Sequence, residues 1–182
     1  EILKKKIDKF ILEPFGKNTA AAITFAALCC DEDEILLVTP SDHLIEEEAE
    51  YKKALLIAQS YANQGFLVTF GIKPNEPNTG YGYIKADLSY SSSRKRNIYA
   101  VDGFREKPDL ATAQRYLEQT GYFWNSGIFV WSVSTIVNAF RVYAPGISRI
   151  FEQLLPVYDT PEERAAIAEH FPACENISVD YA

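Results

Sequence analysis

The sequence contains no methionine, only two histidines and only three cysteines among its 182 residues. The cysteines, Cys29, Cys30 and Cys174, are odd in number and lack C-x-x-C spacing, which excludes a disulfide framework and a cysteine-based zinc site. Neither histidine belongs to a second His or Cys pattern. Any metal in this protein is therefore expected on oxygen ligands.

Long hydrophobic runs are also missing. No segment approaches the roughly 20 apolar residues that a membrane helix needs, and no basic-then-apolar leader opens the chain. The content of 47% hydrophobic and 24% charged residues is ordinary for a globular protein. We therefore expect a cytoplasmic protein without a membrane partner.

Basic residues are fewer than acidic residues in this sequence. Eighteen Lys and Arg residues face twenty-five Asp and Glu residues, a net charge of −7. That balance disfavours a nucleic-acid groove, so no nucleic-acid partner is expected. A phosphate ligand would need individual lysines or a bridging cation.

What is present is an alternation of strand and helix patterns. Apolar runs at 7–13, 34–39 and 66–72 predict strands, and helical spacing over 19–30 and 51–62 predicts the helices between them. This order is typical of an α/β fold with a mostly parallel sheet and right-handed crossovers. Downstream, the pattern predicts strands at 81–86, 98–106 and 122–131, four helices, and the start of a last strand at 176–182.

Asp42 follows the apolar run Ile35-Leu36-Leu37-Val38, at the expected carboxyl end of a buried strand. Ligands of open α/β sheets bind beyond such ends, where a carboxylate can hold a metal ion. Asp180 has a similar position at the last expected strand. If the two carboxylates converge with a phosphate, they would make the oxygen-rich site that Mg²⁺ prefers. Spacing alone leaves their convergence open.

Three other short stretches are unusually polar or glycine-rich for strand edges. Glu106-Lys107 could direct a carboxylate and an ammonium to opposite faces of a strand, or could be a solvated pair. Gly80-x-Gly82 lets a ligand approach the backbone, or is a turn. Asn125-Ser126-Gly127 interrupts an aromatic strand, which is consistent with a bulge or with a sugar-contacting amide.

Taken together and in order, these motifs resemble the sugar-nucleotide pyrophosphorylase family, and within it the mannose-1-phosphate guanylyltransferase branch. The similarity spans nearly the whole chain. The stretches that carry it are Leu12-Glu13-Pro14-x-x-Lys17-Asn18-Thr19-Ala20, Thr39-Pro40-Ser41-Asp42-His43, Gly71 through Ile84, Phe104-x-Glu106-Lys107-Pro108, Phe123-Trp124-Asn125-Ser126-Gly127 and Ser178-Val179-Asp180-Tyr181-Ala182.

The resemblance implies a Rossmann-like nucleotidyltransferase fold in one domain over 1–182. A nucleotide-side core would occupy 1–72, and an inserted sugar-binding lobe and the return to the sheet would occupy 73–182. It also implies roles for particular residues: Mg²⁺ ligands Asp42 and Asp180; mannose contacts Gly82, Glu106 and Asn125; phosphate contact Lys107; guanine-nucleotide contacts Glu13, Asn18 and Thr19.

The implied partners are GTP and mannose 1-phosphate, which would give GDP-mannose and pyrophosphate by in-line attack on the α-phosphorus. Asp42 and Lys107 would be the catalytic residues, and the family leads us to consider a homo-oligomer. Two alternatives stay open. One is a pyrophosphorylase for another sugar 1-phosphate and NTP, and the other is a noncatalytic, sugar-nucleotide-binding regulatory subunit.

The family pattern begins with a Gly-rich signature that ends in an Arg and a Lys and cradles the triphosphate. This sequence starts at Glu1 and shows no such segment. We therefore expect a domain incomplete at both ends, and we expect residues 1–182 alone not to turn over GTP.

Overall fold

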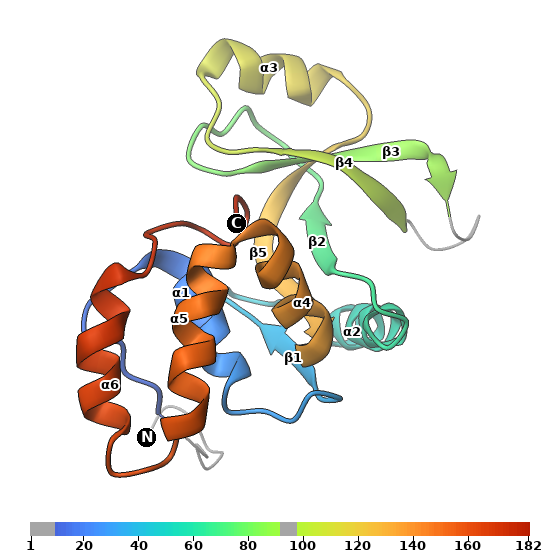
Figure 1. Ribbon diagram of the computed structural model, residues 1–182. Helices are drawn as coiled ribbons and strands as arrows, with labels where there is room; N and C mark the ends of the chain where they lie inside the picture. The colour runs from blue at the N-terminus through green and yellow to red at the C-terminus, as the bar shows by residue number, and fades with distance from the viewer. Residues whose placement is uncertain (1–9, 92–97) are drawn as a thin grey trace. The chain divides into compact units, whose positions relative to one another are not determined.

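The computed structural model describes residues 10–91 and 98–182, which form an α/β fold (Figure 1). Two segments form single 3₁₀ turns, η1 (Leu155–Val157) and η2 (Phe171–Ala173). The helices are α1 (Asn18–Ala27), α2 (Glu48–Ala62), α3 (Leu110–Glu118), α4 (Val133–Tyr143), α5 (Pro145–Leu154) and α6 (Glu163–His170). The strands are β1 (Ile35–Val38), β2 (Val68–Ile72), β3 (Tyr83–Ser91), β4 (Tyr99–Arg105) and β5 (Tyr122–Ser132).

The expected α/β class is confirmed, but two expected strands are not formed. Residues 10–13 of the expected strand 7–13 have no strand structure, and Leu12 is 80% exposed; residues 7–9 lie outside the described residues. Residues 176–182 end in a turn, because the backbone N–H groups of Tyr181 and Ala182 both donate to the carbonyl oxygen of Ser178. Apolar alternation alone does not make a strand without a partner.

The sheet has five strands in the order β1-β5-β3-β4, with β2 paired to β5. The pairs β2–β5, β3–β4 and β3–β5 are antiparallel. The strand and helix alternation predicted a mostly parallel sheet. The three strand pairs whose direction the structure describes are all antiparallel instead. The eleven-residue strand β5 takes part in two of these pairs, and it joins β1, β2 and β3 in one sheet.

The chain divides into two compact units, and each is described by itself. Unit 1 comprises residues 1–36 and 131–182, and unit 2 comprises residues 37–130. These limits differ from the boundary at residue 72 that the sequence suggested between the nucleotide side and the sugar side. Compactness does not test which substrate a segment binds, so that functional boundary stays a prediction.

Helices dominate unit 1. In Figure 1 the orange helices α4 and α5 lie near the blue α1, and α5 contacts α1, α4 and α6. The alanine-rich α1 packs tightly, and Ala20 and Ala21 are fully buried. Next to them, the ring of Phe25 contacts Phe151 edge to face, with the centroids 5.3 Å apart. This packing fixes the first turn of α1, which carries two of the predicted site residues.

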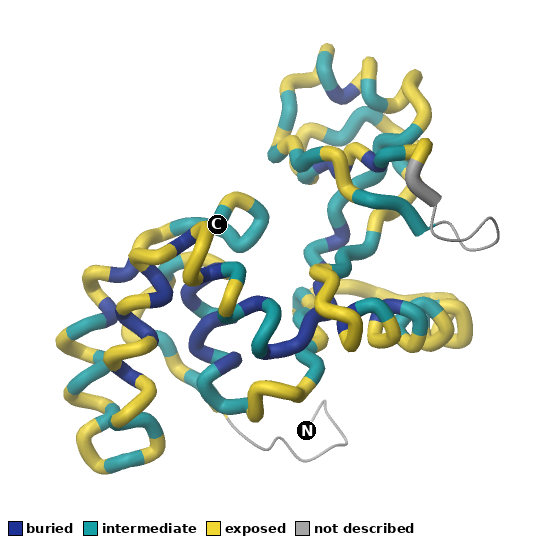
Figure 2. Tube along the Cα trace, turned by 45° about the vertical axis from the view of Figure 1, so that its right-hand side comes forward, coloured by how far each residue is buried: buried dark blue, intermediate teal, exposed yellow. Residues whose placement is uncertain are grey.

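Unit 2 combines α2 and α3 with the strands. The ring of Tyr116 in α3 stacks on Tyr122 of β5 with the centroids 4.1 Å apart, and it also lies 5.3 Å from the ring of the fully buried Tyr83. In Figure 2, α2 is mostly exposed or intermediate, and only Ala58 and Ala62 of that helix are buried. The aromatic contacts under α3 hold β3 and β5 together where the next site residues lie.

Candidate functional site

Three of the predicted substrate residues meet in unit 2. The backbone N–H of Asn125 donates to the carbonyl oxygen of Gly82 over 2.8 Å. A Cβ atom at position 82 would lie 2.5 Å from Oε2 of Glu106 and 3.6 Å from Cβ of Asn125. The Glu106 carboxylate therefore occupies the space above Gly82 that any other residue would fill. We call Gly82, Glu106, Lys107 and Asn125 the Glu106 cluster.

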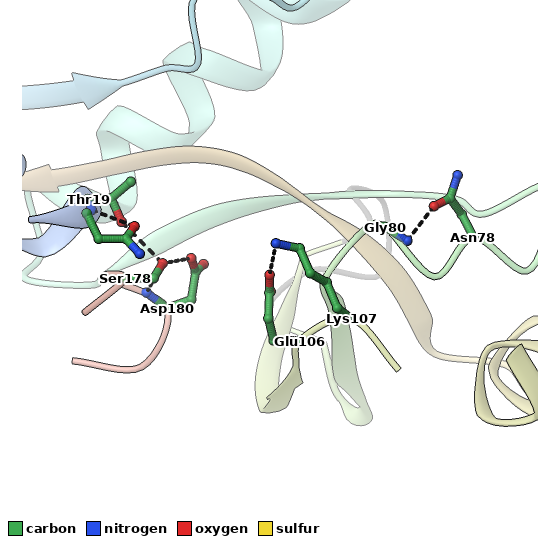
Figure 3. A network of polar contacts seen from close by, with 8 residues as sticks. Thr19, Asn78, Gly80, Glu106, Lys107, Ser178 and Asp180 are labelled. Carbon is green, nitrogen blue, oxygen red and sulfur yellow. Dashed lines mark hydrogen bonds and ion pairs between the residues drawn. The ribbon is translucent and has the colours of Figure 1, made fainter. Parts of the chain in front are cut away.

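Lys107 adopts a left-handed backbone conformation with φ of 41°, which is unusual for a lysine. Its Nζ lies 3.4 Å from Oε1 of Glu106, and the two are drawn as a pair in Figure 3. Of the two possibilities that the sequence left open, opposite faces of a strand or a charge pair at its end, the structure shows the charge pair. Strand β4 ends at Arg105, and the turn at Lys107 brings its side chain back to its neighbour.

The side chain of Asn125 is held from within its own strand region. Its Oδ1 accepts a hydrogen bond from the backbone N–H of Gly127 over 3.2 Å, and the hydroxyl of Thr69 lies 3.5 Å away. The β2–β5 register shifts between Thr69 and Gly71, opposite this segment. The polar triplet in the aromatic strand is thus a local irregularity that Asn125 stabilises, and it also places Asn125 in the Glu106 cluster.

Asp42 is exposed and follows β1. A Cβ atom at Gly127 would lie 3.3 Å from Cγ of Pro40. The turn that leads to Asp42 therefore starts against the segment that follows Asn125. Within unit 2 the structure thus brings the end of β1 and the middle of β5 together.

In unit 1 a hydrogen-bonded chain joins the start of α1 to the segment that carries Asp180. The Thr19 hydroxyl accepts from the backbone N–H of Val179 over 2.9 Å and lies 3.2 Å from the Ser178 hydroxyl. The Ser178 hydroxyl donates to Oδ2 of Asp180 over 2.6 Å (Figure 3). Two predicted site residues, Thr19 and Asp180, are therefore connected through Ser178, for which the sequence predicted no role.

Asn18 precedes this chain in a left-handed conformation, with φ of 66°, and its Oδ1 accepts from the backbone N–H of Thr19 over 2.8 Å. Asn18 is exposed. A left-handed asparagine that bonds to its neighbour is a local device for redirecting the backbone. The structure therefore gives Asn18 a conformational role at the start of α1.

Oε1 of Glu13 is buried and has no hydrogen-bond partner among the described residues. Burial raises the pKa of the Glu13 carboxyl above its ordinary value, because desolvation penalises the charged form. Nearby, Nζ of Lys17 donates to the carbonyl oxygen of Pro172 over 3.0 Å. Lys17 thus anchors the 13–19 segment, and Oε1 of Glu13 accepts no hydrogen bond from residues 10–91 and 98–182.

The model of the protein family described as Nucleotidyl transferase matches residues 4–164. The chain belongs to the nucleotidyl transferase family. Relatives agree with this. The chain is 48% identical over 146 residues to the xanthan biosynthesis protein XanB of Xanthomonas campestris pv. campestris, covering 79% of this chain and 30% of that protein. It is 38% identical over 186 residues to a mannose-1-phosphate guanylyltransferase of Escherichia coli K12, covering 99% of this chain and 39% of that enzyme.

A solved crystal structure is also similar to this chain. The crystal structure of a mannose-1-phosphate geranyltransferase from Thermus thermophilus matches with a TM-score of 0.77 and 34% identity, covering 94% of this chain and 48% of that one. The chain spans less than two fifths of the length of these two curated relatives. These similarities show the fold and the family of this chain.

Nucleotidyl transferases generally use a divalent metal. Within residues 10–91 and 98–182, no three His, Cys, Asp or Glu side chains cluster as a ready-made metal site. Hard divalent cations are usually held by one or two carboxylates together with substrate phosphates and waters. Asp42 and Asp180 each carry carboxylate oxygens of this kind. Separately, none of the helices in the described part of the chain is long and apolar enough to span a membrane.

Proposed function

We propose that the protein carrying this chain transfers a guanylyl group from GTP to mannose 1-phosphate, which gives GDP-mannose and pyrophosphate. The observation that carries the proposal is the Glu106 cluster, in which residues far apart in the sequence meet at one point of unit 2. The similarity to enzymes named mannose-1-phosphate guanylyltransferase supports the choice of substrates. We retain the assignment of the nucleotide side to residues 1–72 and the sugar side to residues 73–182 as part of this proposal.

The Glu106 cluster suits a sugar phosphate. A carboxylate can accept hydrogen bonds from two vicinal hydroxyls, and glycine at position 82 leaves room for the Glu106 carboxylate beside the backbone. The amide of Asn125 offers both a donor and an acceptor. Lys107, whose side chain is 64% exposed, supplies a positive charge for the sugar's phosphate. The pair with Glu106 keeps that charge at the Glu106 cluster before the substrate arrives.

Glu13 suits the base. A buried acceptor without a partner costs about 1–3 kcal/mol, and a ligand that supplies the donor recovers this. The guanine edge presents an N1–H and an exocyclic amino group side by side, which a carboxylate can accept together. Asn18 and Thr19 follow on the same segment and would border the nucleotide. The unused oxygen of Glu13 therefore favours guanine over uracil and thymine, which present one ring N–H between two carbonyls.

Asp42 and Asp180 would hold the divalent ion, which we propose to be Mg²⁺. When bound, the ion supplies positive charge that offsets the negative charge on the phosphates. The protein's own contribution is to hold the two substrates in line and to neutralise charge with Lys107. Because both substrates are highly charged and do not cross membranes unaided, we expect the reaction in the cytoplasm.

The test uses the full-length protein that carries residues 1–182. Purified enzyme is assayed with GTP, ATP, UTP and dTTP against mannose 1-phosphate and glucose 1-phosphate. We expect the highest kcat/KM for GTP with mannose 1-phosphate. A preference for another pair would assign a different pyrophosphorylase, and binding of GDP-mannose without turnover would assign a regulatory subunit.

Asp42→Asn provides the second arm of this test. We expect a loss of orders of magnitude in kcat, because the substitution weakens a metal ligand while it preserves the shape of the side chain. Glu47→Gln is the matched control, because it also removes one exposed carboxylate charge from the segment after β1. Unchanged activity and unchanged metal dependence in Asp42→Asn would remove Asp42 from the site.

A further inference from the structure

The segment that carries Asp180 is fastened to the first turn of α1 by backbone as well as side-chain bonds. The N–H of Ala20 donates to the carbonyl oxygen of Ile177 over 3.2 Å, and the N–H of Val179 donates to the Thr19 hydroxyl over 2.9 Å. Ala20 is fully buried in the helical core of unit 1. The segment is thus fixed on both sides of Ser178, and the Ser178 hydroxyl has a defined place between Thr19 and Asp180.

Each hydroxyl has one proton to donate, and this determines which group is the donor in each of these hydrogen bonds. An ionised carboxylate only accepts, so the single hydroxyl proton of Ser178 is used toward Oδ2 of Asp180 over 2.6 Å. The proton in the 3.2 Å contact between Thr19 and Ser178 must then come from Thr19. Because the Val179 N–H is a donor only, the order runs from Val179 to Thr19, from Thr19 to Ser178 and from Ser178 to Asp180.

The last bond in this order is the strong one. A separation of 2.6 Å lies within the range of about 2.5–2.7 Å typical of hydroxyl bonds to carboxylates, which are roughly twice as strong as neutral ones. Donation from Thr19 polarises the Ser178 hydroxyl further. One oxygen of Asp180 is thereby held in a fixed direction by a neighbour that itself cannot rotate freely.

We propose that Ser178 and Thr19 are positioning residues that hold the Asp180 carboxylate in the orientation that binds the divalent cation. This inference rests on the proposed function, which makes Asp180 a ligand of that cation. In this proposal Ser178 orients Asp180 directly. The Thr19 hydroxyl orients Asp180 through Ser178 and does not itself bind the nucleotide. Partners of this kind orient a metal ligand, and their loss typically weakens metal affinity about 10- to 100-fold.

The test measures Mn²⁺ binding to the full-length protein by electron paramagnetic resonance, in the absence of substrate. Ser178→Ala removes the donor to Asp180, and we expect its Kd for Mn²⁺ to rise about 10-fold. Thr19→Val removes the next donor, and we expect a smaller rise of about 3-fold, since Ser178 is retained. The conservative variants Ser178→Thr and Thr19→Ser keep the hydroxyls and should bind Mn²⁺ nearly as the native protein does.

Two controls separate positioning from mere stability. Ser148→Ala removes another hydroxyl of unit 1 that donates to a carboxylate, that of Glu152, at 3.5 Å, and it should leave the Kd for Mn²⁺ unchanged. Thermal unfolding of every variant is measured in parallel. A lower Tm for Ser178→Ala with an unchanged Kd for Mn²⁺ would show that the hydroxyl only ties the segment to α1, and the proposal would be overturned.

Asp180→Asn distinguishes this proposal from the proposed function. We expect it to lose most Mn²⁺ binding. If it binds Mn²⁺ normally, the metal assignment in the proposed function is wrong and the positioning role is overturned with it. If Asp180→Asn loses binding while Ser178→Ala and Thr19→Val retain it, the metal assignment stands and only the positioning role is overturned.

Discussion

The α-carbon of Gly82 faces the carboxylate of Glu106 so closely that a Cβ atom at position 82 would lie 2.5 Å from Oε2 of Glu106. Contacts this short force one of the two groups to move. Here the group that can move is the carboxylate at the end of the flexible Glu106 side chain. A Cβ atom at position 82 would therefore displace this carboxylate and leave the fold intact.

Gly82→Ala should therefore displace the Glu106 carboxylate and raise the KM for the sugar phosphate about 10-fold, the equivalent of one weakened charged hydrogen bond of about 1.4 kcal/mol. The Tm should change by less than about 3 °C, since the displaced group is a side-chain end. Gly103→Ala is the control, because a Cβ there meets nothing within 4 Å. An unaltered KM for Gly82→Ala would separate Glu106 from sugar binding.

Gly127→Ala should destabilise the protein. Gly127 has φ of +68°, and a Cβ there would lie 3.3 Å from Cγ of Pro40, so strain and crowding combine to cost about 1–3 kcal/mol. Gly146→Ala should have the opposite effect. Position 146 lies in α5 in open space, and alanine there should stabilise by up to about 1 kcal/mol. Urea denaturation of both variants measures the difference, and equal stabilities would contradict the prediction.

Glu13→Gln should make folding stability less dependent on pH. The native pKa of Glu13 lies above its ordinary value of about 4.5, so the native state binds the proton more tightly than the unfolded state does. The contribution of Glu13 to the free energy of unfolding therefore falls as the pH rises from the pKa of the unfolded state through the higher pKa of the native state. Above that window, Glu13→Gln should be more stable than the native protein. At a pH of about 4 the difference should shrink, which denaturation curves from about pH 4 to about pH 8 will show.

The same variant tests the base contact. If Glu13 accepts both guanine donors, Glu13→Gln should raise the KM for GTP about 10-fold or more while it stabilises the free protein, because an amide offers one acceptor in place of a carboxylate's two. A stabilised variant with a native KM for GTP would leave Glu13 as a buried carboxyl without a part in nucleotide binding.

Asn18 allows its backbone role to be separated from any ligand contact. Asn18→Gly accepts φ of 66° without strain and should stay within about 0.5 kcal/mol of the native stability, whereas Asn18→Ala should lose about 1 kcal/mol. Chemical denaturation gives both values. A raised KM for GTP in Asn18→Gly at native stability would then identify the side-chain amide as the nucleotide contact.

The sequence predicted the Glu106 cluster better than it predicted the backbone around it. Six collinear motifs pointed to Gly82, Glu106 and Asn125, and the structure brings these three together. The turn at Lys107 was missed, because a lysine before proline gives no signal for a positive φ. The role of Ser178 was missed for a related reason. Its partners Thr19 and Asp180 include one that lies 159 residues away, and local patterns do not carry such distances.

The strands show the same limit. The strand patterns at 34–39, 66–72 and 98–106 correspond to β1, β2 and β4, because apolar alternation is local. The place of β1 and β2 in the sheet depends on β5, which lies much later in the chain. Residues 176–182 have the composition of a strand, but hydrogen bonds to the first turn of α1 replace pairing with a sheet.

The bond between Thr19 and Val179 spans 160 residues, and unit 1 draws on residues 1–36 and 131–182. Unit 2 is continuous from residue 37 to residue 130. During synthesis at about 5–20 residues per second, unit 2 can fold as soon as it leaves the ribosome, whereas α1 must wait several seconds for its partners. Until then the apolar residues of α1 are open to solvent, because the helices that cover them in the folded chain have not yet been synthesised.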